Sequence, residues 1–280
     1  MWIDTHCHLD APEFSSDYEQ VRAKAANNNV AHCIIPAVHP ETFDRTRKIA
    51  HELNDSFALG IHPLYIKNTD QQALQILDEA LTQHADDSRL VAVGEIGLDF
   101  FVPELCKTPL REKQIFFYRE QLKLAKKHGL AVIVHVRHSA DQLLKRLRDI
   151  GGPDFQWHGI IHAFNGSDQQ ATQFVQLGMK LGFGGAVTFE RALQIRHLLK
   201  FLPLEAIVLE TDAPDMPPQW LYKTKVERQA GAVQSRNQPS EITRIANIIA
   251  ELRGIKLESL AQACWQNSCD AVPRIKSLLM

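Results

Sequence analysis

Short apolar segments alternate with longer amphipathic segments along the whole chain. The short segments are rich in β-branched residues and are bounded by Gly, Pro or polar residues, which is typical of buried strands in a parallel sheet. The sequence predicts eight such strands: Met1–Asp4, His32–Pro36, Phe57–Gly60, Leu90–Gly94, Ala131–His135, Gly159–His162, Met179–Gly182 and Ile207–Glu210.

Amphipathic helices are predicted between these strands. The segment Asp70–His84 places Leu74, Leu77 and Leu81 on one side, and Ser139–Ile150 repeats this spacing. Three helix starts have the spacing of a capping box, in which a Ser or Thr and a Gln three residues later bond each other's backbone. These pairs are Thr69 with Gln72, Ser139 with Gln142, and Ser167 with Gln170.

The alternation of strands and helices predicts a parallel (β/α)8 barrel of the TIM type, which takes roughly 250 residues. A doubly wound open sheet is the alternative fold. It is less favoured because no GxGxxG motif follows the first strand, and because polar residues follow nearly every strand. We therefore expect a single barrel domain over residues 1–280, closed by helices from Ser240 onward, with the active site at the carboxyl ends of the strands.

Residues that bind metals follow several of these strands. The first strand ends in His6-Cys7-His8, where alternation points both imidazoles to one face and Cys7 to the other. Burying such groups unpaired is costly, so their convergence at one mouth predicts a divalent metal site. Nitrogen and oxygen ligands admit Zn, Mn, Ni, Fe or Mg. The candidate ligands are His6, His8, Glu95, His135, His162 and Asp212.

The ligand count favours two divalent cations, Zn, Mn or Mg, joined by Glu95. In this arrangement Glu95 and Asp212 hold one ion with the two histidines of the first strand, and Glu95 holds the other with His135 and His162. Paired ions of this kind lie roughly 3.5–4 Å apart. Two such ions leave the site with a positive charge of about +2, which attracts a phosphate group.

Two further residues are candidate catalytic groups. Glu210 shares the direction of Asp212, because the two are separated by one residue of a strand. It either orients a ligand or transfers a proton. His62 is either a hydrogen-bonded barrel histidine or a contact to the substrate and its leaving group.

Candidate substrate contacts lie beyond the strand ends. Arg137 follows the fifth strand and either binds phosphate or is a solvated surface charge. Arg236 and Asn237 follow the last strand and could reach over the mouth. Asp4, Asp10 and Asp99 are predicted to support the metal ligands, and the cysteines other than Cys7 are predicted to fill the core.

Composition narrows the class of substrate and the location. The 31 basic and 33 acidic residues give a net charge of −2, which lacks the excess of cations that wrapping a long duplex requires. The five cysteines form no CxxC pair, and no apolar run reaches the length of a membrane span. Asp4 stands where a signal peptide has Lys or Arg, so we expect no signal peptide. We therefore expect a cytoplasmic protein with no membrane contact. We also expect a monomer, because no exposed apolar seam marks an obligate protein partner.

Five ordered motifs resemble the TatD family of metal-dependent hydrolases. They are Ile3-Asp4-Thr5-His6-Cys7-His8-Leu9-Asp10, Gly60-Ile61-His62-Pro63, Gly94-Glu95-Ile96-Gly97-Leu98-Asp99, His162-Ala163-Phe164-Asn165-Gly166-Ser167 and Glu210-Thr211-Asp212-Ala213-Pro214. The resemblance spans essentially the whole chain. It implies a somewhat distorted barrel, a divalent metal centre holding the six ligands above, and His62 and Glu210 as further active-site groups. It also implies hydrolysis of phosphoester bonds, typically as a deoxyribonuclease acting on single strands or ends.

The chain departs from the family pattern at a few positions outside the ligand set. His138 stands where an acid is common, Gln238 stands where Glu is common, and the segment from Asn267 to Arg274 lacks the usual aromatic residue. These departures concern the choice of substrate and leave the metal chemistry intact.

We expect a metal-dependent hydrolase that cleaves phosphoester bonds through a water activated by the metals, with Asp212 accepting its proton. Single-stranded or 3′-terminal DNA suits the net charge, and a small phosphoester is the other substrate of this type. An amidohydrolase that cleaves amides or esters is an alternative on the same fold. Such enzymes often bridge their metals with a carbamylated lysine on the fourth strand, and here the stretch from Leu90 to Val102 contains Glu95 and no lysine. A non-enzymatic metal buffer or interaction module is the remaining alternative.

Overall fold

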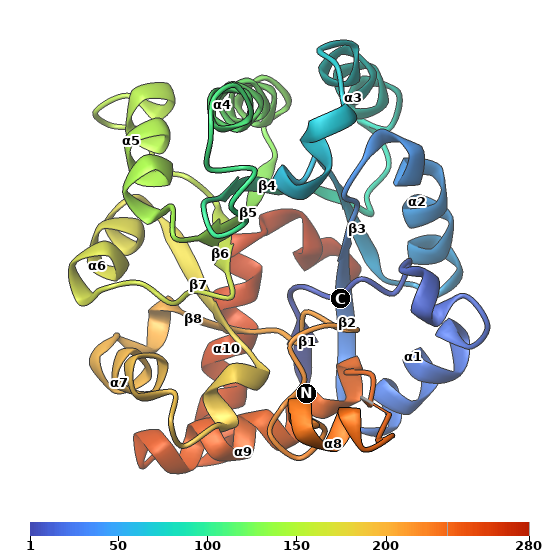
Figure 1. The fold of residues 1–280 in the computed structure, drawn as a ribbon, viewed down its shortest axis with the longest axis vertical. Coiled ribbons are helices and arrows are strands. Elements are labelled where there is room, and N and C mark those ends of the chain that lie inside the picture. Colours follow the sequence, from blue (N-terminus) through green and yellow to red (C-terminus); the bar gives the residue numbers. More distant parts are fainter. Residues whose placement is uncertain (234, 280) are drawn as a thin grey trace.

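Eight parallel strands form a ring that the helices surround (Figure 1). The computed structural model describes residues 1–233 and 235–279. Within these residues the strands pair in chain order from β1 to β8, which confirms the predicted (β/α)8 barrel. The strands are β1 (Trp2–Asp4), β2 (Val30–Pro36), β3 (Ser56–Leu59), β4 (Leu90–Asp99), β5 (Ala131–Arg137), β6 (Gly159–His162), β7 (Met179–Phe183) and β8 (Ile207–Leu209).

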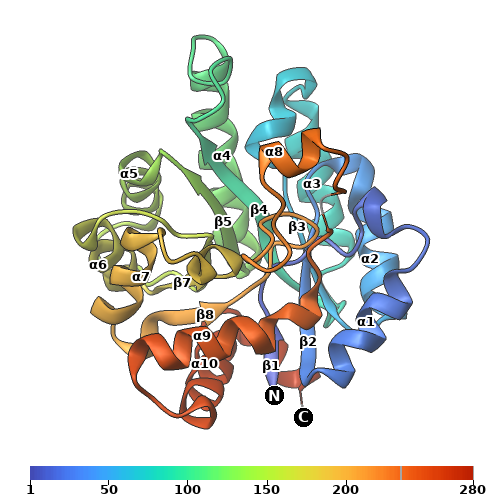
Figure 2. The same cartoon turned by 60° about the horizontal axis from the view of Figure 1, so that its bottom comes forward.

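Most of the helices cover the outer surface of this ring, and the others lie at its ends (Figure 1 and Figure 2). The helices are α1 (Tyr18–Asn27), α2 (Phe43–Glu52), α3 (Gln72–Gln83), α4 (Leu110–His128), α5 (Ala140–Gly151), α6 (Asp168–Gln176), α7 (Leu193–Phe201), α8 (Lys225–Gln229), α9 (Ile242–Arg253) and α10 (Leu257–Ala271). Across the described residues, no helix combines the length and apolar character that a membrane span requires.

The ring closes where β8 meets β1. The amide and the hydroxyl of the buried Thr5 both donate to the carbonyl of Leu209, at 3.1 and 2.9 Å. The pairing register shifts in three of the strand pairs, between β1 and β2, β3 and β4, and β4 and β5. These shifts are the distortion expected for this barrel.

Two apolar clusters of the described residues stabilise the barrel, and neither covers its carboxyl end. The larger cluster lies between the sheet and its surrounding helices. The smaller one joins strand residues such as Ile34 and Ile160 to Val272 and Ile275, which follow α10. Figure 2 shows α9 and α10 along one end of β8 and β1, with α8 set apart near the other end. The C-terminal segment therefore closes the amino end of the barrel, and the functional groups gather at the carboxyl end.

Only one of the three predicted capping boxes forms. Ser167 accepts from the amide of Gln170, whose side chain accepts from the Ser167 amide. The hydroxyl of Thr69 instead donates to the Tyr65 carbonyl, at 2.7 Å, and α3 begins at Gln72 without a side-chain cap. The hydroxyl of Ser139 donates to the Leu98 carbonyl of the neighbouring strand, at 2.6 Å, so that tertiary contact replaces the local cap.

Strands β4 and β5 extend further toward the mouth than the sequence pattern predicts. Their pairing continues to Asp99 and Arg137, whereas we expected the strands to end at Gly94 and His135. The extra pairs form because the backbone continues its ladder past Glu95, through alternating apolar and polar or glycine residues such as Ile96, Leu98 and Asp99, which we did not include in the strand. As a result Asp99 and Arg137 lie directly opposite each other at the rim.

A buried ion pair ties α1 to the segment before β3, and its removal is a stability prediction. The guanidinium of Arg22 donates two hydrogen bonds to Asp55, at 2.6 and 3.0 Å, and Asp55 is fully buried. Replacing Arg22 with Ala should lower the free energy of unfolding by about 3–5 kcal/mol, because it leaves a buried carboxylate without its partner. Chemical denaturation measures this change. The exposed pair of Lys48 and Glu52 provides the control, since Lys48→Ala should cost less than about 1 kcal/mol. Equal losses in the two variants would contradict this account of the Arg22 pair.

Candidate metal centre

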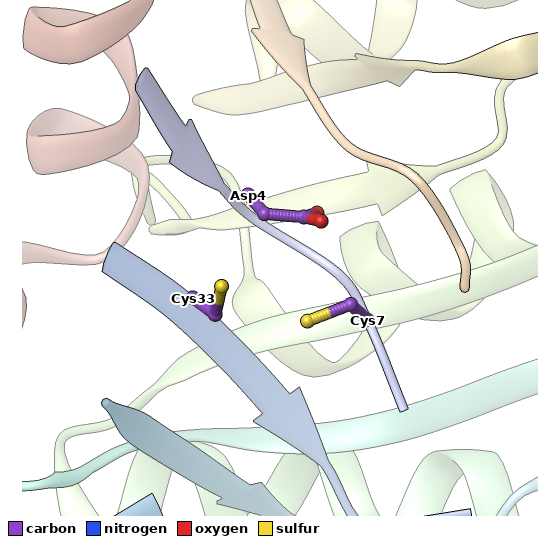
Figure 3. A group of neighbouring side chains, drawn as sticks. All are labelled: Asp4, Cys7 and Cys33. Carbon is purple, nitrogen blue, oxygen red and sulfur yellow. The ribbon is translucent and has the colours of Figure 1, made fainter. Parts of the chain in front are cut away.

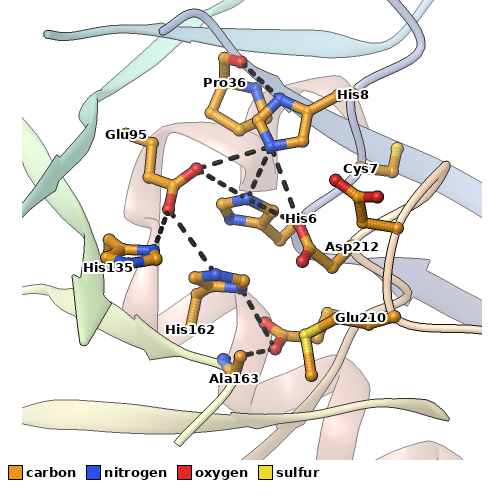
Figure 4. A network of polar contacts seen from close by, with 12 residues as sticks. His6, Cys7, His8, Pro36, Glu95, His135, His162, Ala163, Glu210 and Asp212 are labelled. Atoms are coloured by element: carbon orange, nitrogen blue, oxygen red, sulfur yellow. Dashed lines mark hydrogen bonds and ion pairs between the residues drawn. The ribbon is translucent and has the colours of Figure 1, made fainter. Parts of the chain in front are cut away.

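The six predicted metal ligands meet at the carboxyl end of the barrel, around the carboxylate of Glu95 (Figure 4). They line or adjoin a cavity of about 940 Å³, whose wall includes His8, Glu95, His135 and Asp212. Because parallel strands end at the same edge, residues far apart in sequence reach this single point.

The two oxygens of Glu95 face two separate groups of imidazoles. Oε2 lies 3.1 Å from Nε2 of His6 and 3.4 Å from Nε2 of His8. Oε1 faces three other ring nitrogens, those of His135 at 3.0 Å, His62 at 3.2 Å and His162 at 3.5 Å. Glu95 therefore occupies the position of a carboxylate shared between two sets of ligands.

Asp212 completes the first of these sets. Its Oδ1 lies 3.5 Å from Nε2 of His6 and 3.7 Å from Nε2 of His8, and its amide donates to the His6 carbonyl. Its backbone is left-handed, with φ of 56°, which turns the side chain toward the mouth. Burial raises the pKa of Asp212 to about 6, although the charges of His162 and His8 favour its ionised form.

Backbone and carboxylate partners fix which ring nitrogen of several histidines carries the proton. Nδ1 of His8 lies 3.1 Å from the Pro36 carbonyl, which only accepts, so Nε2 of the neutral ring directs its lone pair into the centre. In the same way, Nε2 of His135 lies 3.2 Å from Asp99 and leaves Nδ1 free to ligate. These are the outer partners that metal-binding histidines normally have.

His62 has the opposite arrangement. Its Nδ1 accepts from the amide of Leu64 at 3.2 Å, so in the neutral ring Nε2 carries the hydrogen. Burial lowers the pKa of His62 despite the opposing charge of Glu95, which keeps the ring neutral. His62 is therefore a hydrogen-bond donor beside the ligands.

The donor set fits a divalent cation. Nε2 of His6 and Nε2 of His8 lie 3.2 Å apart and both point at one carboxylate oxygen. On the other side of that carboxylate, Nδ1 of His135 and Nε2 of His162 lie 3.0 and 3.5 Å from Oε1. Ring nitrogens and carboxylate oxygens gathered around one point in this way are the donors that a divalent cation binds.

Glu210 supports His162 from below. Its Oε1 accepts from the amide of Ala163 at 2.5 Å and lies 3.4 Å from Nδ1 of His162. Gly182 provides the space for this carboxylate, because a Cβ at that position would collide with it. Glu210 is buried and lies outside the cavity wall among the described residues, so its contacts indicate orientation of a ligand.

A second group of potential ligands lies beneath the centre, where Asp4, Cys7 and Cys33 approach one another (Figure 3). Cys7 turns away from the histidines beside it, as strand alternation predicts. Both oxygens of Asp4 accept hydrogen bonds from Thr211, at 3.0 and 2.6 Å, and burial raises the pKa of both thiols. Asp4 therefore fastens β1 to the segment that carries Asp212, as predicted for a supporting residue.

Two glutamines of α4 position the loops around the centre. The side chain of Gln121 both accepts from and donates to the backbone of Ile61, next to His62. Gln114 does the same for the backbone of Asp99. Neither role is predictable from the helical pattern, because a glutamine on a buried helix face has no local partner that reveals it.

Comparisons with known proteins agree with this geometry. Residues 3–272 match the family model described as TatD related DNase. The chain belongs to the TatD family. It is 39% identical over 268 residues to the Escherichia coli protein named uncharacterized metal-dependent hydrolase YjjV, covering 95% of this chain and 96% of that protein. The crystal structure of the E. coli TatD homolog YjjV superposes with a TM-score of 0.86 at 38% identity, covering 97% and 98% of the two chains.

A human relative carries a more specific name. The protein named deoxyribonuclease TATDN3 is 32% identical over 285 residues, which cover 99% of this chain and 96% of that protein. Together with the donor set, these relationships identify a metal-dependent hydrolase of the TatD family.

The predicted substrate contacts lie in different surroundings in this TatD hydrolase. Arg137 lines the cavity. The guanidinium of Arg236 instead bonds Asp17 and the Glu13 carbonyl, and among the described residues neither Arg236 nor Asn237 belongs to the cavity wall. Their polar groups are used within the protein, which the sequence pattern does not reveal.

Asn237 is fully buried and holds the loop that carries Asp212. Its amide nitrogen donates to the carbonyls of Thr211 and Asp215, both at 2.8 Å. Replacing Asn237 with Ala should reduce kcat of the TatD hydrolase about 10- to 100-fold, because the loop shifts and misplaces Asp212. Steady-state kinetics on the metal-loaded enzyme measure this loss, with Asn247→Ala on the exposed face of α9 as the control. An unchanged kcat would show that the loop keeps its position without Asn237.

Proposed function

We propose that this TatD hydrolase cleaves phosphodiester bonds of DNA, acting on single strands or 3′ ends with two divalent cations. The observation that carries the proposal is the position of Glu95, whose two oxygens each face a separate group of imidazoles at the cavity mouth. A centre of this kind attracts an anionic substrate. The deoxyribonuclease name of the human relative supports DNA as that substrate.

The ligand roles follow from the two groups. His6, His8 and Asp212 would hold one cation with Oε2 of Glu95, and His135 and His162 would hold the other with Oε1. Bound divalent cations supply Lewis acidity, which makes water acidic enough to ionise near neutral pH and offsets phosphate charge. Zn, Mn and Mg all suit this set of nitrogen and oxygen donors.

Two side chains of the cavity assist the reaction directly. Asp212 lines the cavity, and its carboxylate accepts the proton of the attacking water. His62, which burial keeps neutral, donates a hydrogen bond from Nε2 to the leaving oxygen at the cavity wall, and solvent water supplies the proton that this oxygen takes up. Glu210 holds His162 in place and does not touch the substrate, which makes it a positioning residue.

A cleavage assay on a 5′-labelled single-stranded DNA oligonucleotide tests the proposed function. Chelator-stripped protein is reloaded separately with Mg, Mn and Zn, and a stripped sample serves as the control. We expect metal-dependent products that shorten from the 3′ end. Hydrolysis of small phosphate esters without cleavage of DNA would show that the substrate is a small phosphoester and not DNA. Activity on amide or ester substrates alone would overturn the proposal in favour of an amidohydrolase.

A further inference from the structure

An exposed aromatic ring lies just beyond the end of β4, next to the cavity-lining side chain of Arg137. Phe101 is 51% exposed, although large apolar side chains are normally buried. Its backbone is firmly placed, because Oδ1 of Asp99 accepts from the amides of Phe101 and Val102 at 2.9 and 3.1 Å. These hydrogen bonds hold the turn that exposes the ring to solvent. The other oxygen of Asp99, Oδ2, faces His135.

Arg137, at the end of the adjacent strand β5, lies over the face of this ring. Its guanidinium carbon is 3.7 Å from the ring centroid of Phe101, the distance of a stacked cation–π contact. The side chain remains 47% exposed and lines the cavity. Among the described residues its nearest carboxylate oxygen, on Asp99, lies 3.9 Å away, which is too long for a hydrogen bond. Its donors and its outer face therefore remain available to a ligand.

The two side chains together have the chemistry that recognises nucleobases. Unpaired bases stack on aromatic rings and on the planes of arginine guanidinium groups, and the positive charge also attracts the neighbouring phosphates. A small phosphate ester would use the charge of Arg137 but has no need of a flat apolar support behind it. Phe101 and Arg137 also lie close to the candidate metal centre, since Asp99 contacts both Arg137 and the candidate metal ligand His135.

We propose that Phe101 and Arg137 form a stacking platform for one nucleobase of an unpaired strand whose phosphate enters the metal centre. This inference rests on the proposed function and adds a specificity determinant to it. Phe101 supports the guanidinium from behind, and the exposed face of Arg137 receives the base. A base held in a duplex cannot occupy this position without leaving its own stack.

The test uses single-stranded DNA oligonucleotides in which one nucleotide at a time, next to the cleaved bond, is abasic. With the manganese-loaded wild-type enzyme, one abasic position should lower kcat/KM by about 5- to 150-fold, the range expected for loss of one stacked base. In Phe101→Ala and in Arg137→Lys, which keeps the charge but not the plane, intact and abasic strands should be cleaved at nearly equal rates.

Phe155→Ala is the matched control. Phe155 also carries a cation over its ring, with the Lys126 ammonium at 4.5 Å, but it lies before β6 at the amino end of the barrel. This variant should keep the full wild-type preference for the intact strand. If Phe101→Ala keeps that preference as well, the platform is wrong while the proposed nuclease function stands. If wild-type enzyme cleaves no DNA, the proposed function fails and the platform fails with it.

Discussion

Replacing Glu95 with Gln should lower the hydrolytic rate of this TatD hydrolase by more than about 10³-fold. Removing one electrostatic stabiliser from a dry active site already costs about 10²–10³-fold, and Glu95 faces both groups of ligands at once. The amide keeps the size of the side chain but presents a donor to one group of ring nitrogens. Both cation positions should therefore weaken together.

Elemental analysis of the purified variant distinguishes loss of metal from loss of folding. Glu95→Gln should contain fewer divalent ions per chain than wild type and should retain its far-ultraviolet circular dichroism. Glu104→Gln is the control, because Glu104 is an exposed carboxylate paired with Lys67. A Glu95→Gln protein that kept both its metal content and its turnover would show that the carboxylate does not organise the centre.

Replacing Asp212 with Asn should lower the rate by about 10²–10⁴-fold, the range for losing a general base. The carboxylate oxygen is 3.5 Å or more from Nε2 of His6 and His8, and those ring nitrogens also face Glu95. The other ligands therefore remain in place, so we expect the variant to retain metal while losing turnover.

Single-turnover cleavage and metal analysis on the same protein sample check this prediction. Asp215→Asn provides the comparison, because it removes a nearby acid of the same cavity wall at which no catalytic role is proposed. Near-normal cleavage by Asp212→Asn would show that Asp212 does not accept the proton of the attacking water. Loss of cleavage together with all metal would make Asp212 an essential ligand and leave the identity of the base open.

The positions of the strands and the convergence of the six ligands are predictable from the sequence because both follow from local geometry. Alternation in β1 sends His6 and His8 to one face, and parallel strands bring their carboxyl ends to one edge. The remaining ligands are predicted in the same way from the ends of later strands, and the resemblance to the TatD family agrees with them. The structure brings these side chains around Glu95.

Contacts between distant segments are what the sequence does not reveal. Ser139 has the spacing of a helix cap, yet its hydroxyl donates to Leu98 on the next strand. Arg236 has the sequence position of a substrate contact, yet its guanidinium donates hydrogen bonds to Asp17. Phe101 carries no signal in the sequence pattern, and its contact with Arg137 depends on the register of β4 against β5. Each outcome is decided by a tertiary neighbour that no local pattern specifies.

The central claim is that hydrolysis takes place at a centre of two cations joined by Glu95. Titration of manganese into chelator-stripped protein, with bound metal and DNA cleavage measured at each step, tests it most directly. We expect two ions to bind per chain, and we expect cleavage to develop fully only as the second position fills. In Glu95→Gln we expect weaker binding of both ions and loss of cleavage. Full cleavage at one ion per chain, with no second ion bound, would contradict it.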